Sequence, residues 1–372
     1  MRDAEFVDGA GSTLPLQGLA LGVKDNFDTA ELPTELGSPI YAGHRPAADA
    51  WAVARLRAAG AVCLGKTVTA EFALFHPGPT RNPWRLSHTP GGSSSGSAAA
   101  VATGMADVAL GTQTAGSVIR PASFCGVWGF KPTFGVVPRD GVRLVAPSLD
   151  TVGWFARTAA DLDAVRRVLM DDASQSVALV GAPRLALVRT EQWPAVGPGS
   201  RHALETACNR ARVAGAAVVD RAMPEPFIGL AALQPQVQMF EAARSFAGER
   251  EQHAASLSPA LLAYLATGEQ VIEADYEQVL GRAADARLAA EQLFAGVDVL
   301  LTPAVLDEAP LGLASTGDPR LAQLWTLLGW PTVAVPGLYG TTGLPVAVQL
   351  VGRPGADAEL LAVAAWLGDQ LT

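Results

Sequence analysis

The chain has 372 residues, of which 49% are hydrophobic and 17% charged, so it is long and apolar enough to bury a large core. Its net charge of −9 argues against nucleic acid or an anionic membrane as the main partner, and no apolar run is long enough to predict a transmembrane helix. The opening segment 1–11 lacks the apolar centre of a signal peptide, and the three cysteines are odd in number and widely spaced. These features predict a cytoplasmic protein without a disulfide framework or a zinc site.

The first half of the chain alternates short apolar strands with helices. Residues 16–29 predict a buried strand that runs into a turn, and residues 46–67 predict an amphipathic helix, a stop at Gly60 and a strand at 61–64. Residues 95–113 predict a Gly/Ser loop, an Ala-rich helix, a glycine turn and a further strand.

The second half repeats the same order of elements. Residues 200–221 and 285–304 each predict a helix, a glycine and a strand, and residues 225–295 are mostly helical. Residues 330–354 predict two strands around a Gly-rich turn, followed by a final helix. This alternation predicts an α/β fold with a largely parallel core, in a single domain over residues 1–372.

One segment matches a nucleotide-binding pattern by its letters alone. Residues 60–67, GAVCLGKT, satisfy G-x-x-x-x-G-K-[ST]. That site needs a strand before the first glycine and a helix after the threonine, because the helix N-terminus faces the phosphates. Here a helix precedes Gly60 and the middle of the segment is strand-like, so we expect a helix-to-strand turn.

The block SHTPGGSSSGSAAA at residues 87–100 poses a second question. Its composition is typical of a linker, yet residues 92–96 match the nucleophile pattern G-x-S-x-G around Ser94. That pattern also needs a strand before the serine and a suitably placed acid and histidine after it. The segment before Ser94 is not strand-like, and only His202 and His253 follow, neither in a distinctive loop.

A third arrangement combines two serines with a scarce lysine. Only three of the 27 basic residues are lysines, and Lys24 ends a predicted strand. Ser93 opens the Gly/Ser loop, and Ser117 closes GTQTAGS, 24 residues later, after one helix and one strand. A return of that length can bring both serines to one cleft. The residues alone leave open a Ser–Lys hydrolase and an α/β domain with ordinary turns.

Longer stretches resemble the amidase signature family. They are PGGSSSGSAAAVATG, LGTQTAGSVIRPASFCGVWGFKPT and SLDTVGWFARTAADL, together with GVKDNFD and GLPVAVQLVGRP. The resemblance runs from about residue 15 to the end, and its most specific part covers about residues 60–160. It implies a central mixed sheet flanked by helices and hydrolysis of carboxamides without metal or cofactor. The chain looks closest to small members such as malonamidase-like and indole-acetamide-hydrolase-like amidases.

The resemblance also implies roles for individual residues. Ser117 would be the nucleophile, Ser93 a bridging serine preceded by a cis peptide bond, and Lys24 the base. This assignment is chemically consistent, because a serine hydroxyl needs a base and a lysine must be desolvated to act as one. The resemblance further implies an oxyanion hole that consists of the backbone amides of Thr114, Ala115, Gly116 and Ser117. The expected substrate contacts are Gly92, Ser94 and Arg120.

The chain departs from the family pattern near the nucleophile. Gln113 stands where an aspartate is common, and Ala115 replaces a frequent glycine. Arg120 lies one place later than in many relatives, so it either points into the pocket, where it would select a carboxylate-bearing amide, or holds the loop. The nearby aromatic residues favour core positions over pocket positions (Phe75, Trp84, Trp128 and Phe130).

The expected function is hydrolysis of a small-molecule carboxamide to carboxylate and ammonia, through an acyl-enzyme on Ser117. Two alternatives stay open, namely the glutamine-hydrolysing A subunit of a tRNA-dependent amidotransferase and a non-catalytic scaffold of the same fold. The expected partner is a small-molecule amide, with no nucleic acid and no membrane, and a homodimer is compatible with the sequence.

Overall fold

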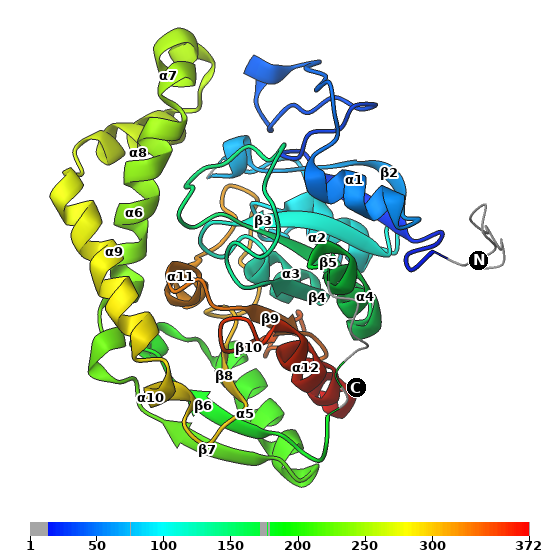
Figure 1. Cartoon of the computed structure of the whole chain (residues 1–372), viewed down its shortest axis with the longest axis vertical. Helices are drawn as coiled ribbons and strands as arrows, with labels where there is room; N and C mark the ends of the chain where they lie inside the picture. The colour runs from blue at the N-terminus through cyan, green and yellow to red at the C-terminus, as the bar shows by residue number, and fades with distance from the viewer. Residues whose placement is uncertain (1–13, 75, 172–176, 178, 372) are drawn as a thin grey trace.

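One mixed sheet of ten strands forms the centre of the molecule. The computed structural model describes residues 14–74, 76–171, 177 and 179–371, and the opening segment 1–11 therefore lies outside the described residues (Figure 1). The strand order is β2-β1-β3-β5-β4-β9-β10-β8-β6-β7. The strands are β1 (Ala20–Lys24), β2 (Val62–Thr67), β3 (Val108–Gln113), β4 (Trp128–Lys131), β5 (Thr151–Ala156), β6 (Arg184–Val188), β7 (Ala217–Arg221), β8 (Val299–Pro303), β9 (Thr332–Val335) and β10 (Val348–Val351).

Helices cover both faces of this sheet. One face packs against α1 (Trp51–Ala58), α4 (Ala159–Leu169), α5 (Pro198–Val213) and α12 (Asp357–Leu371). The other face packs against α2 (Ser95–Ala102) and α3 (Ile119–Cys125) beside β3, β4 and β9. The layered α/β prediction is therefore confirmed.

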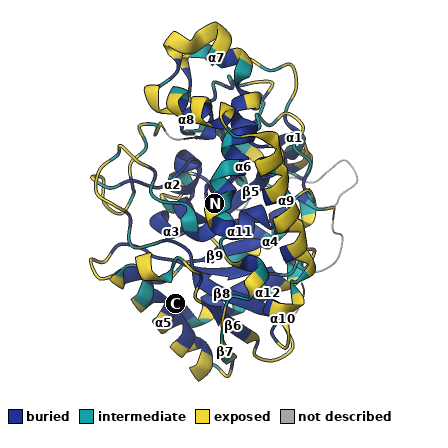
Figure 2. Ribbon diagram, turned by 90° about the vertical axis from the view of Figure 1, so that its left-hand side faces the viewer, coloured by how far each residue is buried: buried dark blue, intermediate teal, exposed yellow. Residues whose placement is uncertain are grey.

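A helical arm completes the second face. It consists of α6 (Leu230–Ser245), α7 (Ala247–His253), α8 (Pro259–Glu269), α9 (Glu273–Leu288) and α10 (Glu291–Phe294), and α11 (Arg320–Leu327) packs against α6. The exposed faces of α7, α8 and α9 contrast with the buried sheet in Figure 2. Short 3₁₀ turns lie at Pro39–Tyr41, Glu71–Ala73, Trp193–Ala195, Glu225–Phe227 and Ala254–Ser256. Within the described ranges, no helix is both long and apolar enough to cross a membrane.

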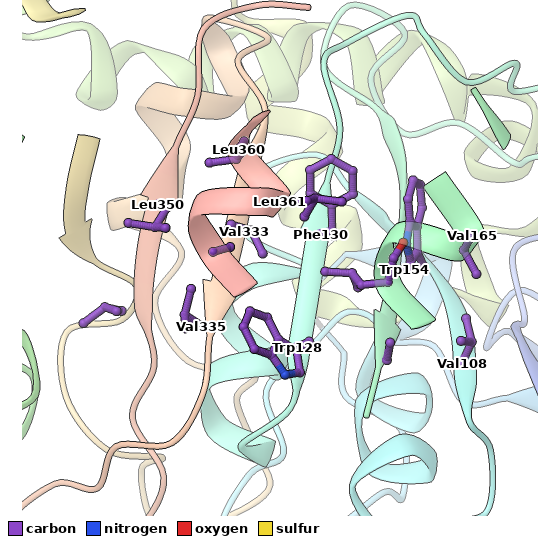
Figure 3. Close-up of a cluster of buried hydrophobic side chains, with 14 of the residues drawn as sticks. Val108, Trp128, Phe130, Trp154, Val165, Val333, Val335, Leu350, Leu360 and Leu361 are labelled. Atoms are coloured by element: carbon purple, nitrogen blue, oxygen red, sulfur yellow. The ribbon is translucent and has the colours of Figure 1, made fainter. Parts of the chain in front are cut away.

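The central strands are buried on both faces, so their sequences are almost wholly apolar. Phe130 of β4 lies opposite Trp154 of β5 in the antiparallel ladder, and their rings meet edge to face with centroids 5.1 Å apart. Figure 3 shows these rings with Val165 of α4 and with Leu360 and Leu361 of α12. Cross-strand aromatic pairs of this kind stabilise the register of neighbouring strands. The core therefore holds β3, β4 and β5 in fixed positions, and the segments that follow or precede them form the site.

The sequence predicted the elements better than the direction of their pairing. The sheet is mixed, but parallel pairing is restricted to its two ends, β2-β1-β3 and β8-β6-β7, and every pair between β3 and β8 is antiparallel. The expected predominance of parallel pairs is therefore wrong for the centre. The region 285–304 also holds the end of α9 and the short α10 rather than one helix before its strand. Hydrophobic patterning reports burial on two faces, and it does not report strand direction.

Candidate active site

A buried lysine lies at the end of β1, between β2 and β3 in the sheet. Lys24 closes β1 and is fully buried, with its Nζ atom 2.9 Å from the Ser93 hydroxyl and 2.8 Å from the Thr112 hydroxyl. Burial lowers the pKa of this lysine to about 7, and the charge of Asp150 partly opposes that shift. A large share of the Lys24 side chains is therefore uncharged at neutral pH, which is the state that a proton acceptor needs.

The Gly/Ser block is a buried, hydrogen-bonded segment rather than a linker. The Gly92–Ser93 peptide bond is cis, as the family resemblance implied. Gly91 has a φ of +80°, and a Cβ atom there would lie 2.8 Å from the Pro121 Cα, so glycine is required. Hydrogen bonds tie the block to Val68, the residue after β2, and to β3, namely Gly96 N to the Val68 carbonyl at 2.9 Å and Ser97 Oγ to the Leu110 carbonyl at 2.8 Å.

The segment 114–117 connects β3 to α3, and Gln113 is one of its anchors. The Gln113 Oε1 atom accepts hydrogen bonds from the Val118 and Ile119 amides at 2.9 and 3.0 Å. Its Nε2 atom donates to the Thr326 hydroxyl, which itself donates to the Ala115 carbonyl at 2.7 Å. A neutral amide oxygen therefore accepts from the amides at the start of α3, so the segment has an anchor here without an acidic side chain.

The Ser117 side of the site opens on a cavity of about 570 Å³. Ser117 lines this cavity and keeps 8% of its surface exposed, whereas Lys24 and Ser93 do not line it and are exposed by 0% and 1%. Several segments far apart in the sequence supply the wall of the cavity. These are Ala73, Leu74, His76 and Pro77, then Thr114, Ala115, Ser117 and Arg120, then Pro235, Gln238, Ala260 and Tyr264, and finally Ala314, Ser315, Thr316, Gly317, Pro319 and Gln323.

Arg120 both holds the loop and faces the cavity, so the two interpretations of the sequence coexist. Its Nη2 atom donates to the Gly92 carbonyl at 2.6 Å and to the Thr316 hydroxyl at 3.1 Å. Its Nε and Nη1 atoms are buried and have no hydrogen-bond partner. Burial lowers the pKa of this guanidinium to about 10, so it stays charged at neutral pH. Because Arg120 lines the cavity, its positive charge favours an anionic ligand there.

Some of the expected substrate contacts are not supported by their positions. Ser94 is fully buried, does not line the cavity and donates its hydroxyl to the Thr112 carbonyl at 3.3 Å. This position also argues against Ser94 as a nucleophile. Gly92 contributes its carbonyl to Arg120, and a Cβ atom on it would lie 2.7 Å from Thr316 Cγ2. Both residues therefore shape the site from behind the cavity wall.

The structure also tests the predictions for the aromatic residues near the motifs and for the nucleotide-binding pattern. Trp128 and Phe130 are core residues as expected, and Phe75 lies outside the described residues. The expected core position is wrong for Trp84, which is half exposed and packs against Tyr339. In the rejected nucleotide-binding segment, Thr67 ends a strand, so the helix that such a site requires is not there. Over the part of the chain that the structure describes, no three His, Cys, Asp or Glu side chains gather as around a metal ion.

Several residues around the site were not predicted from the sequence. Thr112 accepts from Lys24 at 2.8 Å, and Asp150 accepts from the Thr114 hydroxyl at 2.5 Å. Gln234 of α6 donates to the Thr114 carbonyl at 2.8 Å, and Thr316 contacts Arg120. Thr112 and Asp150 lie within the stretches that resemble the family, which was a usable signal. Gln234 and Thr316 stand in unremarkable sequence and come to the site only through the tertiary fold.

Comparison with known proteins gives consistent matches over nearly the whole chain. The family model Amidase matches residues 1–361. The A subunit of the glutamyl-tRNA(Gln) amidotransferase of Anaeromyxobacter dehalogenans is 36% identical, over 96% of this chain and 83% of that protein. A crystal structure of an amidase superposes with a TM-score of 0.89 at 32% identity, over 98% of this chain and 87% of that one. The native peptide amidase of Stenotrophomonas maltophilia gives 0.77 at 30% identity, over 97% and 84%.

Proposed function

The chain belongs to the amidase family, and from that premise we propose that it hydrolyses a small carboxamide to a carboxylate and ammonia through an acyl-enzyme on Ser117. Family membership makes it an enzyme that acts on amide C–N bonds. The observation that best supports an acyl-enzyme on Ser117 is the hydrogen bond from the fully buried Lys24 to Ser93, beside the segment that presents Ser117 to the cavity.

The proposed reaction starts with a proton relay. Uncharged Lys24 takes the proton of Ser93, which takes the proton of Ser117 as the Ser117 oxygen attacks the amide carbon. The backbone amides of residues 114–117 donate to the oxyanion of the tetrahedral intermediate, and each such donor contributes about 3 kcal/mol in comparable enzymes. The proton then returns through Ser93 to the leaving nitrogen as the C–N bond breaks. Water hydrolyses the resulting Ser117 ester by the same relay.

For the substrate, we propose an amide that also carries a carboxylate. The positive charge of Arg120 at the cavity wall supports this class, since a substrate carboxylate that reaches one of its unpaired nitrogen atoms would form a charge-assisted hydrogen bond. A malonamate-like half-amide is one small member of the class. The proposal requires no metal and no cofactor, because the relay and the oxyanion hole supply both the proton transfer and the charge stabilisation.

The test uses the chemistry of the nucleophile and not the unknown substrate. A fluorophosphonate probe should label Ser117, as mapped by peptide mass spectrometry, and Ser117→Ala should lose both the labelling and ammonia release from a panel of small amides. Ser94→Ala provides the matched control, since Ser94 is a neighbouring buried serine without a role in the relay. Labelling of Ser94 instead, or hydrolysis by Ser117→Ala at the normal rate, would refute the proposal.

A second candidate function follows from the names of the relatives. Several are A subunits of glutamyl-tRNA(Gln) amidotransferases, so glutamine hydrolysis within a larger complex is the alternative. Ammonia release from small amides by the purified chain alone, without a preference for glutamine, would favour the stand-alone amidase. A non-catalytic scaffold would give no probe labelling at all. A single amidase domain over residues 1–372, a cytoplasmic location and a homodimer belong to the same proposal.

A further inference from the structure

A carboxylate lies directly behind the proposed oxyanion segment, at a position that the sheet register determines. In the antiparallel ladder of β3 and β5, Gln113 pairs with Thr151. The same register, carried one residue further, brings Asp150 opposite Thr114. The Thr114 hydroxyl donates to Asp150 Oδ1 at 2.5 Å. Asp150 therefore contacts one of the residues whose backbone amides are proposed to stabilise the oxyanion.

Asp150 also holds the turn that precedes β5. Its Oδ2 atom accepts from the Val145 and Ala146 amides at 2.6 and 3.0 Å. The side chain is buried, with 3% of its surface exposed, and all three donors come from segments next to the site. On the opposite side, Gln234 of α6 donates to the Thr114 carbonyl at 2.8 Å. The side chain and the carbonyl of Thr114 are thus fixed from two directions.

The same carboxylate acts on the proposed base through its charge. Asp150 favours the protonated form of Lys24, against the effect of burial, and it is the charged group that acts on this lysine among the described residues. Burial raises the pKa of Asp150 itself to about 6, with the Arg139 guanidinium opposing that shift. The nearby Lys66 and Asp25, from β2 and the end of β1, pair with each other at 3.3 Å. Asp150 is therefore charged above about pH 6, where Lys24 loses its proton.

We propose that Asp150 is a positioning residue for the proposed reaction, which fixes Thr114 in the oxyanion segment, two residues after the Thr112 that accepts from Lys24, and whose negative charge acts on that lysine. The inference rests on the proposed function and deepens it. It assigns two separable effects to one side chain. The hydrogen bond to Thr114 sets how fast Ser117 reacts, and the charge sets the pH at which Lys24 becomes a base.

The experiment measures the second-order rate of fluorophosphonate labelling of Ser117 between pH 5 and 9. Asp150→Asn removes the charge and turns an NH₂ group toward either Thr114 or the two amides. Thr114→Val removes the hydroxyl and keeps the carboxylate. The matched control is Asp357→Asn, because Asp357 is an equally buried aspartate that accepts from Thr133 Oγ1 at 2.6 Å and from the Thr133 amide at 2.8 Å, and it faces Lys131 instead of Lys24. Thermal unfolding of each variant reports whether it is folded.

The two effects give different results. Asp150→Asn should lower the plateau rate by about 10- to 100-fold, the range for a lost hydrogen bond to a charged group, and should move the midpoint to lower pH by about one unit. Thr114→Val should lower the plateau and leave the midpoint in place, and Asp357→Asn should change neither.

Three results would overturn the inference. They are a normal plateau in Thr114→Val, an unmoved midpoint in folded Asp150→Asn, and equal losses in Asp357→Asn and Asp150→Asn. Absence of Ser117 labelling in the unmodified protein is a different result, since it removes the proposed function itself and this inference with it.

Discussion

Replacement of Arg120 by leucine separates the two tasks of this side chain. The guanidinium donates to the Gly92 carbonyl at 2.6 Å and to Thr316 at 3.1 Å, and its buried Nε and Nη1 atoms have no hydrogen-bond partner among the described residues, while the residue itself lines the cavity. Loss of the first two bonds disturbs the loop whatever the substrate is. Loss of the two unpaired donors matters only for a substrate that carries a carboxylate.

The magnitude follows from the number of bonds that each substrate loses. The Nε and Nη1 hydrogens point to different edges of the guanidinium, so one substrate carboxylate can pair with only one of these nitrogen atoms. A hydrogen bond to a charged group contributes about 1.5–3 kcal/mol, so we expect a selective loss of about 10- to 100-fold in kcat/KM. Malonamate and malonamide form the test pair, since they differ only in whether the second group is a carboxylate or an amide.

The assay is ammonia release by the unmodified protein and by Arg120→Leu with each substrate. The ratio of kcat/KM for malonamate to that for malonamide should fall by about 10- to 100-fold in the variant. Fluorophosphonate labelling of the variant measures separately how far the loop itself was disturbed. If kcat/KM falls by the same factor for both substrates, Arg120 only holds the loop and the proposed substrate class is wrong.

Three further predictions concern the base, the loop anchor and the Gly/Ser block. Lys24 must be uncharged to act, and burial lowers its pKa to about 7, so kcat/KM should rise between about pH 6 and 8 and then level off. A rise that continues toward pH 10 would contradict this role. Gln113→Glu keeps an acceptor for the Val118 and Ile119 amides, so this variant should retain Ser117 labelling. Gln113→Ala should lose most of the labelling. Equal labelling rates in the two variants would show that the acceptor is not needed. Gly91→Ala should lower the free energy of unfolding in urea by about 2 kcal/mol or more, because φ is +80° and the new Cβ would lie 2.8 Å from the Pro121 Cα. An unchanged free energy of unfolding would show that the turn can rearrange.

The elements that carry the site were predictable because their signals are local. The apolar stretch before Lys24, the Ala-rich helix after the Gly/Ser block and the strand before Gln113 all appear in the structure near their predicted bounds. The cis bond before Ser93 followed from the family resemblance, as did the grouping of Lys24 with Ser93. Composition alone gave the wrong description of the Gly/Ser block as a linker. Small residues permit a flexible chain, but they also permit the close packing that Gly91 makes against Pro121.

The contacts between distant segments could not be predicted from the sequence. Thr316 meets Arg120, and Gln234 meets Thr114, across 196 and 120 residues. Periodicity and turn residues report on neighbours along the chain, and they carry no information about which segment crosses a cavity.

The sequence by itself determined the order of helices and strands, the family, and the three side chains proposed to carry the reaction. The tertiary structure decided the properties of those side chains. Lys24 has an ordinary amine in the sequence, and its pKa falls to about 7 only because the sheet removes it from water beside Ser93 and Thr112. Arg120 could hold a loop or face a ligand, and in the fold it holds the loop with one nitrogen while the residue also lines the cavity. Proton affinity and ligand preference depend on burial and on charges brought in from elsewhere in the chain, and only the folded molecule fixes both.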